Sequence, residues 1–156
     1  MSAIESTDDA LVGLPALMAL VKSVIEAQTT ARCSKFVIDH SGNTPSHLID
    51  ETFSLDLQSE NTDKYREDVA IRAGHSLVVT TIRKLRPQDQ FASQLDGLRR
   101  EEEIMRALSE RVATVEVRVV YRSTARALSP SREYLITRIA FGIEHDWWSQ
   151  PMSPTE

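Results

Sequence analysis

The chain has 156 residues, of which 41% are hydrophobic and 26% charged, and its formal net charge at pH 7 is −5. This size and composition are those of one ordinary globular domain, and they exclude an intrinsically disordered or fibrous protein. The negative charge argues against a dedicated nucleic-acid-binding protein, because such proteins carry a basic surface that neutralises phosphates.

Taken in chain order, the N-terminal third predicts a helix and a short strand. Residues 1–12 are expected to form a flexible N-terminal segment. The helix is expected over residues 14–30, because apolar side chains recur there three and four residues apart and Pro15 suits the first helical turn. The short strand is expected over residues 35–39, and the turn-forming residues after it predict a loop.

The middle of the chain predicts two strands joined by a long loop. Apolar and polar side chains alternate over residues 52–58, which is the pattern of a half-buried strand. Residues 59–68 are polar and acidic and predict an exposed hairpin loop. The second strand is expected over residues 69–85, with a bulge at Ala73 and Gly74, and Pro87 ends it.

A second helix is expected over residues 89–109. Gly97 weakens its middle by about 1 kcal/mol and predicts a kink or a division into two shorter helices. The charged run over residues 99–103 predicts a solvated face with pairs four residues apart, such as Glu102 with Arg106. The helix also carries an apolar stripe, which we expect to pack against the sheet. Its members are Phe91, Leu95, Leu98, Met105 and Leu108, with Ile104 beside them.

The last third predicts a long antiparallel hairpin. Apolar and polar residues alternate over 115–122 and again over 135–144, and the turn-forming stretch 126–132 separates them. Residues 149–156 contain two prolines and predict a flexible tail. The order of elements predicts one α+β domain over residues 1–148, with an antiparallel or mixed β-sheet of four to five strands and two helices packed on one face. A parallel crossover through the second helix would make the sheet mixed.

The sequence offers no recognisable catalytic or cofactor-binding motif. The four histidines show no helical i,i+4 pair, and HExxH, CxxC, a glycine-rich phosphate loop and GxSxG are all absent. The single cysteine, Cys33, cannot form an internal disulfide, favours a reducing compartment and is interpreted as a buried, inert thiol. The apolar stretch over residues 11–21 is too short to cross a bilayer. We therefore expect no enzyme, no cofactor, no metal site and no membrane contact.

Two features point to protein contacts. The basic residues comprise 14 arginines and 4 lysines, and arginine is common in interfaces, although the base composition of the source genome explains the bias equally well. Trp147 and Trp148 end the last strand, where alternation directs one to the core and the other outward; the alternative is that both cover the core. The candidate interface residues are Tyr65, Arg66, Arg99, Arg100, Arg118, Arg122, Trp147 and Trp148.

The order of elements and the residue pattern of the second half of the sequence resemble those of the tail terminator proteins of long-tailed bacteriophages. The matching text consists of LVVTTIRKLRP over residues 77–87, QLDGLRREEEIMRAL over 94–108, VEVRVVY over 115–121 and REYLITRIAFGIEH over 132–145. The resemblance covers roughly residues 10–146 and is one of pattern, so no individual functional residue is carried over from the family. The N-terminal acidic segment and the two tryptophans have no counterpart in it.

The resemblance implies a homo-oligomer, a hexameric ring that caps the tail tube, stops its polymerisation and offers a joining surface to a head–tail connector or stopper protein. DNA would only pass through the lumen of this ring, without sequence-specific binding, and acidic subunits would repel rather than hold it. The expected location is the tail or neck of the virion, after assembly in the host cytoplasm.

Three alternatives stay open. A head–tail connector or tail completion protein would have a similar size, and the sequence does not separate it from a terminator. A small metal-dependent or hydrolytic enzyme would use Asp39, His40, Asp56 or His75. A bacterial adaptor unrelated to phages is the third alternative, which neighbouring genes would discriminate.

Overall fold

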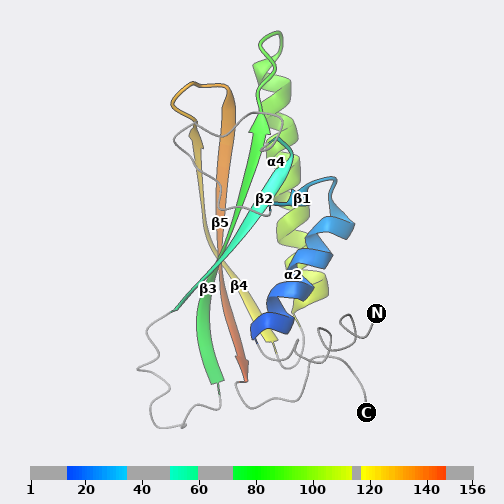
Figure 1. The fold of residues 1–156 in the computed structure, drawn as a ribbon, viewed down its shortest axis with the longest axis vertical. Coiled ribbons are helices and arrows are strands. Elements are labelled where there is room, and N and C mark those ends of the chain that lie inside the picture. The colour runs from blue at the N-terminus through cyan, green and yellow to red at the C-terminus, as the bar shows by residue number, and fades with distance from the viewer. Residues whose placement is uncertain (1–13, 35–49, 60–71, 114–116, 147–156) are drawn as a thin grey trace, which may run out of the picture.

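The computed structural model describes residues 14–34, 50–59, 72–113 and 117–146 (Figure 1). The expected strand over residues 35–39 and most of the expected hairpin loop lie outside these residues. So do the two terminal segments and four candidate interface residues, Tyr65, Arg66, Trp147 and Trp148.

The first helix, α2, spans Leu14–Gln28 and confirms the prediction from apolar spacing. The side chains that recur at helical spacing form one buried face, made by Leu17, Val21, Val24 and Ile25. The Thr29 hydroxyl ends the helix by donating to the Ile25 carbonyl at 2.9 Å, and it accepts the Ala31 N–H at 3.1 Å. This turn leads the chain directly into the first strand.

The five strands form one mixed sheet in the order β1-β2-β3-β5-β4. They are β1 Arg32–Cys33, β2 Thr52–Ser59, β3 Arg72–Lys84, β4 Val117–Leu128 and β5 Tyr134–Asp146. The β1–β2 pair is parallel and the other three pairs are antiparallel. Because β5 lies between β3 and β4, these last two strands run parallel to each other across it. The predicted crossover through the second helix therefore exists, and it delivers the chain to the edge of the sheet. It is not what makes the sheet mixed, because β3 and β4 are not paired with each other; the parallel β1–β2 pair makes it mixed.

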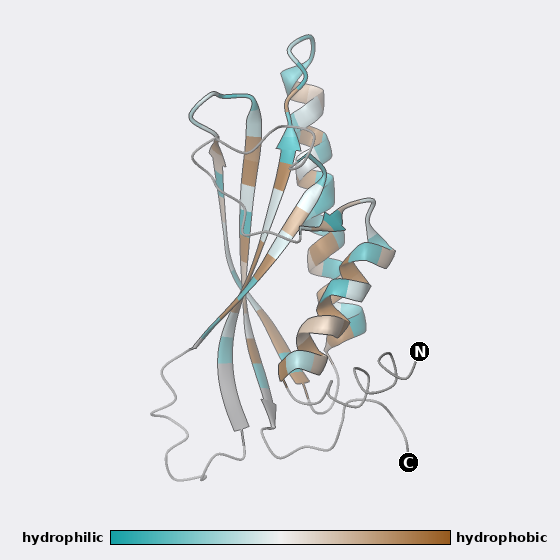
Figure 2. Cartoon of the chain, viewed as in Figure 1, coloured by the Kyte–Doolittle hydropathy of each residue, from teal (hydrophilic) through white to brown (hydrophobic). Residues whose placement is uncertain are grey.

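Both helices cover the same face of the sheet, which confirms the two-layer α+β fold (Figure 1). The main core lies between the layers, where Phe53, Leu77 and Phe141 from three strands meet the buried face of α2. Figure 2 shows the apolar residues as bands along the strands, as alternation requires. A smaller buried cluster of Ile82, Tyr134 and Ile136 lies on the opposite face of the sheet.

The second helix, α4, spans Gln90–Ala107 and continues into a π-helical turn, η2, at Leu108–Val112. The Asp89 carboxylate begins it by accepting the Ala92 N–H at 3.0 Å. The division into two shorter helices expected at Gly97 is wrong, because one continuous helix runs through it. Gly97 instead allows close packing: a Cβ at this position would lie 3.0 Å from Cδ2 of Leu135 on β5.

The bulge expected at Ala73 and Gly74 is also wrong. Pairing between β3 and β5 is uninterrupted from the Arg72–Asp146 pair to the Lys84–Tyr134 pair. The register shift lies on β4 instead, between Tyr121 and Ser123. Within the part of the chain that the structure describes, no helix combines the length and apolarity that a membrane span needs.

Candidate protein-interaction surface

The outer face of α4 carries apolar side chains that were expected to be buried. Phe91 is 69% exposed, Leu95 45% and Leu98 38%. Spaced four and three residues apart, these three side chains share one face of the helix, which we call the outer stripe. The expected packing of the whole apolar stripe on the sheet is therefore wrong for its N-terminal half. Its C-terminal half behaves as predicted, because Ile104 and Leu108 are buried.

The side of α4 that faces the sheet is small and charged in its first half. Ser93 and Gly97 are buried there, followed by Arg100 and Glu101. The run over residues 99–103 is therefore not a uniformly solvated face, as was predicted. The Glu101 carboxylate accepts two bonds from Arg126 of β4, from Nε at 2.8 Å and from Nη2 at 2.6 Å. This bidentate pair explains how the charged side chain of Glu101 can be buried on the side of α4 that faces the sheet.

A groove of about 410 Å³ opens between α4 and the tip of the β4–β5 hairpin. Its surface is mostly apolar, and Arg126 is one of the residues that line it. Leu128, which is 47% exposed, adds to the apolar surface at this end of the molecule. The residues that line the groove are Gln94, Leu98, Arg126, Ala127, Leu128 and Leu135. The groove therefore adjoins the outer stripe, with Leu98 common to both.

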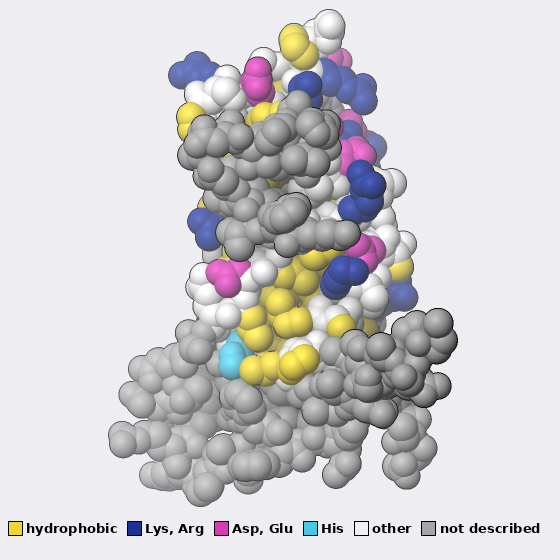
Figure 3. Space-filling view, in the orientation of Figure 1, with side chains coloured by type: hydrophobic (Ala, Val, Ile, Leu, Met, Phe, Trp, Pro, Cys, Tyr) yellow, Lys and Arg dark blue, Asp and Glu magenta, His cyan; other side chains and the backbone are white. Residues whose placement is uncertain are grey.

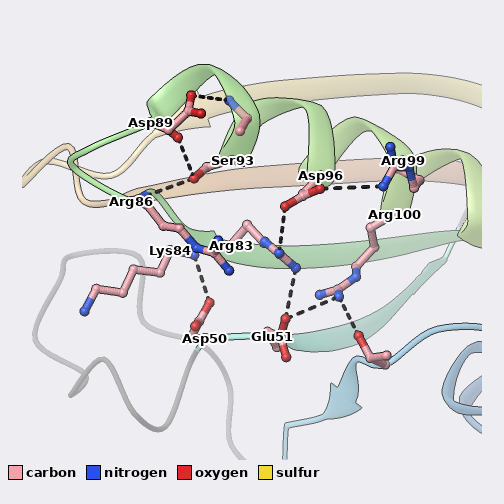
Figure 4. Close-up of polar contacts among 12 residues, drawn as sticks. Asp50, Glu51, Arg83, Lys84, Arg86, Asp89, Ser93, Asp96, Arg99 and Arg100 are labelled. Carbon is pink, nitrogen blue, oxygen red and sulfur yellow. Dashed lines mark hydrogen bonds and ion pairs between the residues drawn. The ribbon is translucent and has the colours of Figure 1, made fainter.

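A polar network ties α4 to the strands on the other flank of the helix (Figure 4). Arg83 of β3 donates to Glu51 at 3.0 Å and to Asp96 of α4 at 3.1 Å. Arg99, one of the candidate interface residues, is exposed and lies 3.7 Å from Asp96. Glu51 has a φ of 56°, a conformation that non-glycine residues adopt rarely, and its carboxylate still reaches Arg83. In Figure 3 acidic and basic side chains alternate along the right-hand side of the molecule, where the helices lie.

Arg100 lies inside the fold rather than on its surface, with 7% of the residue exposed. Its Nη2 donates to the Thr30 hydroxyl at 2.8 Å and lies 3.8 Å from the Glu51 carboxylate. Burial lowers the pKa of Arg100, and the nearby charge of Arg83 lowers it further. Among the described residues, its buried Nε and Nη1 have no hydrogen-bond partner.

Arg83, Arg99 and Arg100 line a cavity of about 400 Å³ at the C-terminal end of α2. Asp96 and Glu103 line the same cavity, and Glu51 pairs with two of the arginines. The three positive charges are thus matched by three negative ones. We interpret this network as a clamp that fixes α4 on the sheet, with no charge excess that would select an anion.

The strand β4 forms one edge of the sheet, since it pairs only with β5 among the described strands. Arg118 and Arg122, both candidate interface residues, are exposed on it. Arg122 follows Tyr121 at the register shift, and its guanidinium lies over Gly142, where a Cβ would come within 2.6 Å of Nε. Charged side chains and bulges discourage pairing with a further strand. This edge is therefore poorly suited to extending the sheet.

The residues proposed for an enzymatic alternative do not converge where the structure describes them. Asp56 pairs with Val78 across β2 and β3, whereas His75 pairs with Ser59, so alternation places their side chains on opposite faces of the sheet. Asp39 and His40 lie outside the described residues. In the described ranges no group of three or more histidine, cysteine, aspartate or glutamate side chains could hold a metal ion.

Comparison of the sequence with protein-family models and with curated proteins finds no match in either.

Of the candidate residues that the structure describes, the arginines fall into two groups. Arg99, Arg118 and Arg122 are on the surface, whereas Arg100 belongs to the internal clamp. Sequence reasoning did not select the outer stripe and the groove as an interaction surface. The available signal was the smallness of Ser93 and Gly97 on the face opposite Phe91, which marks the side of a helix that packs closely on a sheet.

Proposed function

We propose that this protein is a structural subunit of a phage tail, a terminator-like protein that forms a ring, caps the tail tube, stops its polymerisation and provides the joining surface for the head. The proposal joins the resemblance in the second half of the sequence to one structural observation. That observation is the outer stripe: an ordered, capped helix that turns three large apolar side chains to solvent.

The outer stripe favours a protein contact over a solvated helix surface. Single exposed apolar residues are normal, but Phe91, Leu95 and Leu98 share one face and adjoin an apolar groove. Burying a large apolar side chain contributes about 1.5–3 kcal/mol, so covering Phe91, which is 69% exposed, would contribute about 1–2 kcal/mol. A contact repeated around a ring multiplies this contribution by the number of subunits.

The arrangement of α4 on the sheet also suits a subunit that must keep its shape while bound on several sides. The clamp of Arg83 and Arg100 holds one flank of the helix, and the Glu101–Arg126 pair holds the other. The outer stripe is therefore carried by a helix fixed to a five-stranded sheet. A surface that is rigid before binding loses little conformational entropy on association.

The test is a tube-capping experiment with the full-length protein. The tail-tube protein encoded in the same genome would be polymerised with and without this chain, and tube lengths and end structures would be measured by electron microscopy. We expect shorter tubes with a ring at one end. We also expect the free protein to have a native mass several times that of a single chain.

Two results would contradict the proposal. Tubes of unchanged length with bare ends would exclude capping. Recovery of the protein on isolated heads and its absence from headless tails would assign it instead to a head–tail connector.

A further inference from the structure

We infer that the groove between α4 and the β4–β5 hairpin is a receptor for an aromatic side chain, and that its occupant is Phe91 of a second copy of this chain. The inference deepens the proposed function, on which it rests, by naming the contact between subunits. It depends on the chemistry of the groove, the state of Phe91 and the separation between the two.

The groove has the two components that bind an aromatic ring. Leu98, Leu128 and Leu135 supply an apolar surface for the ring. Arg126, which also lines the groove, carries a guanidinium, a group that stacks favourably on the electron-rich face of an aromatic ring within about 6 Å. A volume of about 410 Å³ leaves room for a whole side chain.

The guanidinium of Arg126 is already oriented. The carboxylate of Glu101, which is buried on the sheet-facing side of α4, accepts hydrogen bonds from Arg126 Nε at 2.8 Å and from Arg126 Nη2 at 2.6 Å. The Arg126 side chain nevertheless stays 46% exposed. A charged group fixed by a bidentate pair and still open to solvent on its remaining surface loses little freedom when a ring stacks on it.

Phe91 is the aromatic side chain of the described chain that best fits as occupant. The other exposed aromatic residue, Tyr121, is already engaged: its ring meets that of Phe141 edge to face at 6.2 Å, and its hydroxyl bonds to Thr124 at 2.8 Å. Phe91 is 69% exposed, and no ring contact is found for it among the described residues.

Phe91 does not fill the groove of its own chain. It is absent from the lining of the groove, and on a continuous helix it stands seven residues from Leu98, about 10 Å along the axis. Ring and groove thus lie side by side on one rigid surface, a complementary pair within each copy. Such a pair is satisfied when the ring of one copy enters the groove of another, either reciprocally or head to tail around a closed ring.

The experiment uses the full-length protein and three single variants. Phe91→Ala removes the ring and keeps the groove, whereas Leu128→Glu keeps the ring and places a carboxylate in the groove beside Arg126. Tyr121→Ala is the matched control, because it removes an exposed aromatic side chain outside the groove. Native mass spectrometry and sedimentation equilibrium over a concentration series measure association, and circular dichroism establishes that each variant is folded.

We expect the wild type and Tyr121→Ala to associate equally, and Phe91→Ala and Leu128→Glu each to weaken association by about ten-fold or more. Mixing the two weakened variants should restore a complex that contains one copy of each, since one retains a groove and the other a ring. This recovery separates a specific ring-in-groove contact from a general loss of apolar surface.

Two results would overturn the inference, and they are distinguishable. A wild-type oligomer that Phe91→Ala leaves unchanged would show that the copies meet elsewhere, and the proposed function would stand without this contact. A wild type that is monomeric at every concentration would exclude the contact between copies. The proposed function would then fail as well only if the monomer also leaves tail tubes uncapped.

Discussion

Replacing Arg126 by methionine tests whether the buried Glu101 carboxylate of α4 depends on its ion pair with Arg126 for its stability. The Glu101 side chain is 7% exposed and accepts two hydrogen bonds, at 2.8 and 2.6 Å, both from Arg126. Removal of the arginine leaves a buried carboxylate without this partner. Hydrogen bonds to charged groups contribute about 1.5–3 kcal/mol, and because Arg126 is itself 46% exposed we expect a loss near the lower end, about 2 kcal/mol.

The assay is urea unfolding at pH 7, extended to a double-mutant cycle. Glu101→Gln removes the charge with little change of shape, and the double variant should be more stable than the sum of the two losses predicts, with a coupling energy of about 1 kcal/mol or more. The control is Lys22→Met, which breaks the exposed Lys22–Glu26 pair at 3.0 Å and should cost less than about 0.5 kcal/mol. Additive losses in the cycle, or a cost for Arg126→Met no larger than that of the control, would refute the reasoning.

Three further predictions concern the stability of the fold and its reactivity. Gly97→Ala should change the unfolding free energy by less than about 1 kcal/mol, because the gain in helix propensity opposes the 3.0 Å approach to Leu135, whereas Gly97→Val should destabilise clearly in the same urea assay. Cys33 is only partly buried, not fully buried as predicted, and this burial raises the pKa of its thiol. Alkylation by iodoacetamide at pH 8 should therefore be slower in the native protein than in urea, and equal rates would contradict this. Hydrogen bonds donated by Lys22 and by the Cys33 N–H hold the pKa of the Glu26 carboxyl below its usual value. The Glu26 carboxylate therefore stabilises the fold at pH values above its unfolded-state pKa, and this contribution is lost as the pH falls through its folded-state pKa. The stability difference between the wild type and Glu26→Gln should therefore shrink on acidification from pH 7 to pH 3, and a constant difference would count against the pair.

The parts of the fold that depend on local pattern were predictable from the sequence. Apolar spacing located α2, Leu14–Gln28, together with its buried face, and alternation located β2, Thr52–Ser59, and the β4–β5 hairpin. These patterns work because a helix or strand with one apolar side has one stable orientation against a core. The two-layer α+β class followed from the order of these elements.

The strand order and the two local irregularities were not predictable in the same way. The position of β5 between β3 and β4 depends on pairing with β3 between residues that are 50 to 74 positions apart in sequence, from Lys84 with Tyr134 to Arg72 with Asp146. Gly97 was interpreted as a weak point of a helix, whereas it marks a close approach to Leu135, which only the packed structure reveals. The register shift at Tyr121 and Ser123 leaves no local signal, because neither residue is a glycine or proline.

Among the features that the sequence predicted wrongly, the orientation of α4 is the one that bears most directly on the proposed function. Periodicity identified a stripe through Phe91 and Leu98 but not the side of the helix that the sheet would take. The buried side is set instead by Gly97, which admits the closest approach, and by Glu101, whose partner Arg126 lies 25 residues further along the chain. A pair at that separation is invisible to any rule based on local spacing.

In a monomer, this orientation of α4 leaves one group in unfavourable surroundings on each side of the helix. Arg100 is desolvated with two of its nitrogens unpartnered among the described residues, while the Phe91 ring remains in water. If α4 were rotated by half a turn about its axis, the Phe91 ring would pack against the sheet and Arg100 would return to solvent. The ion pairs nevertheless fix the helix in the observed orientation. A sequence that fixes a helix with its largest apolar side chain outward is consistent with a stability that is completed by association, because only a second surface recovers the hydrophobic contribution of Phe91. Two sets of ion pairs, Glu101–Arg126 and the Arg83 network, fix this one helix, and they hold the outer stripe in a single orientation. A fixed stripe of this kind is what the proposed contact between copies requires.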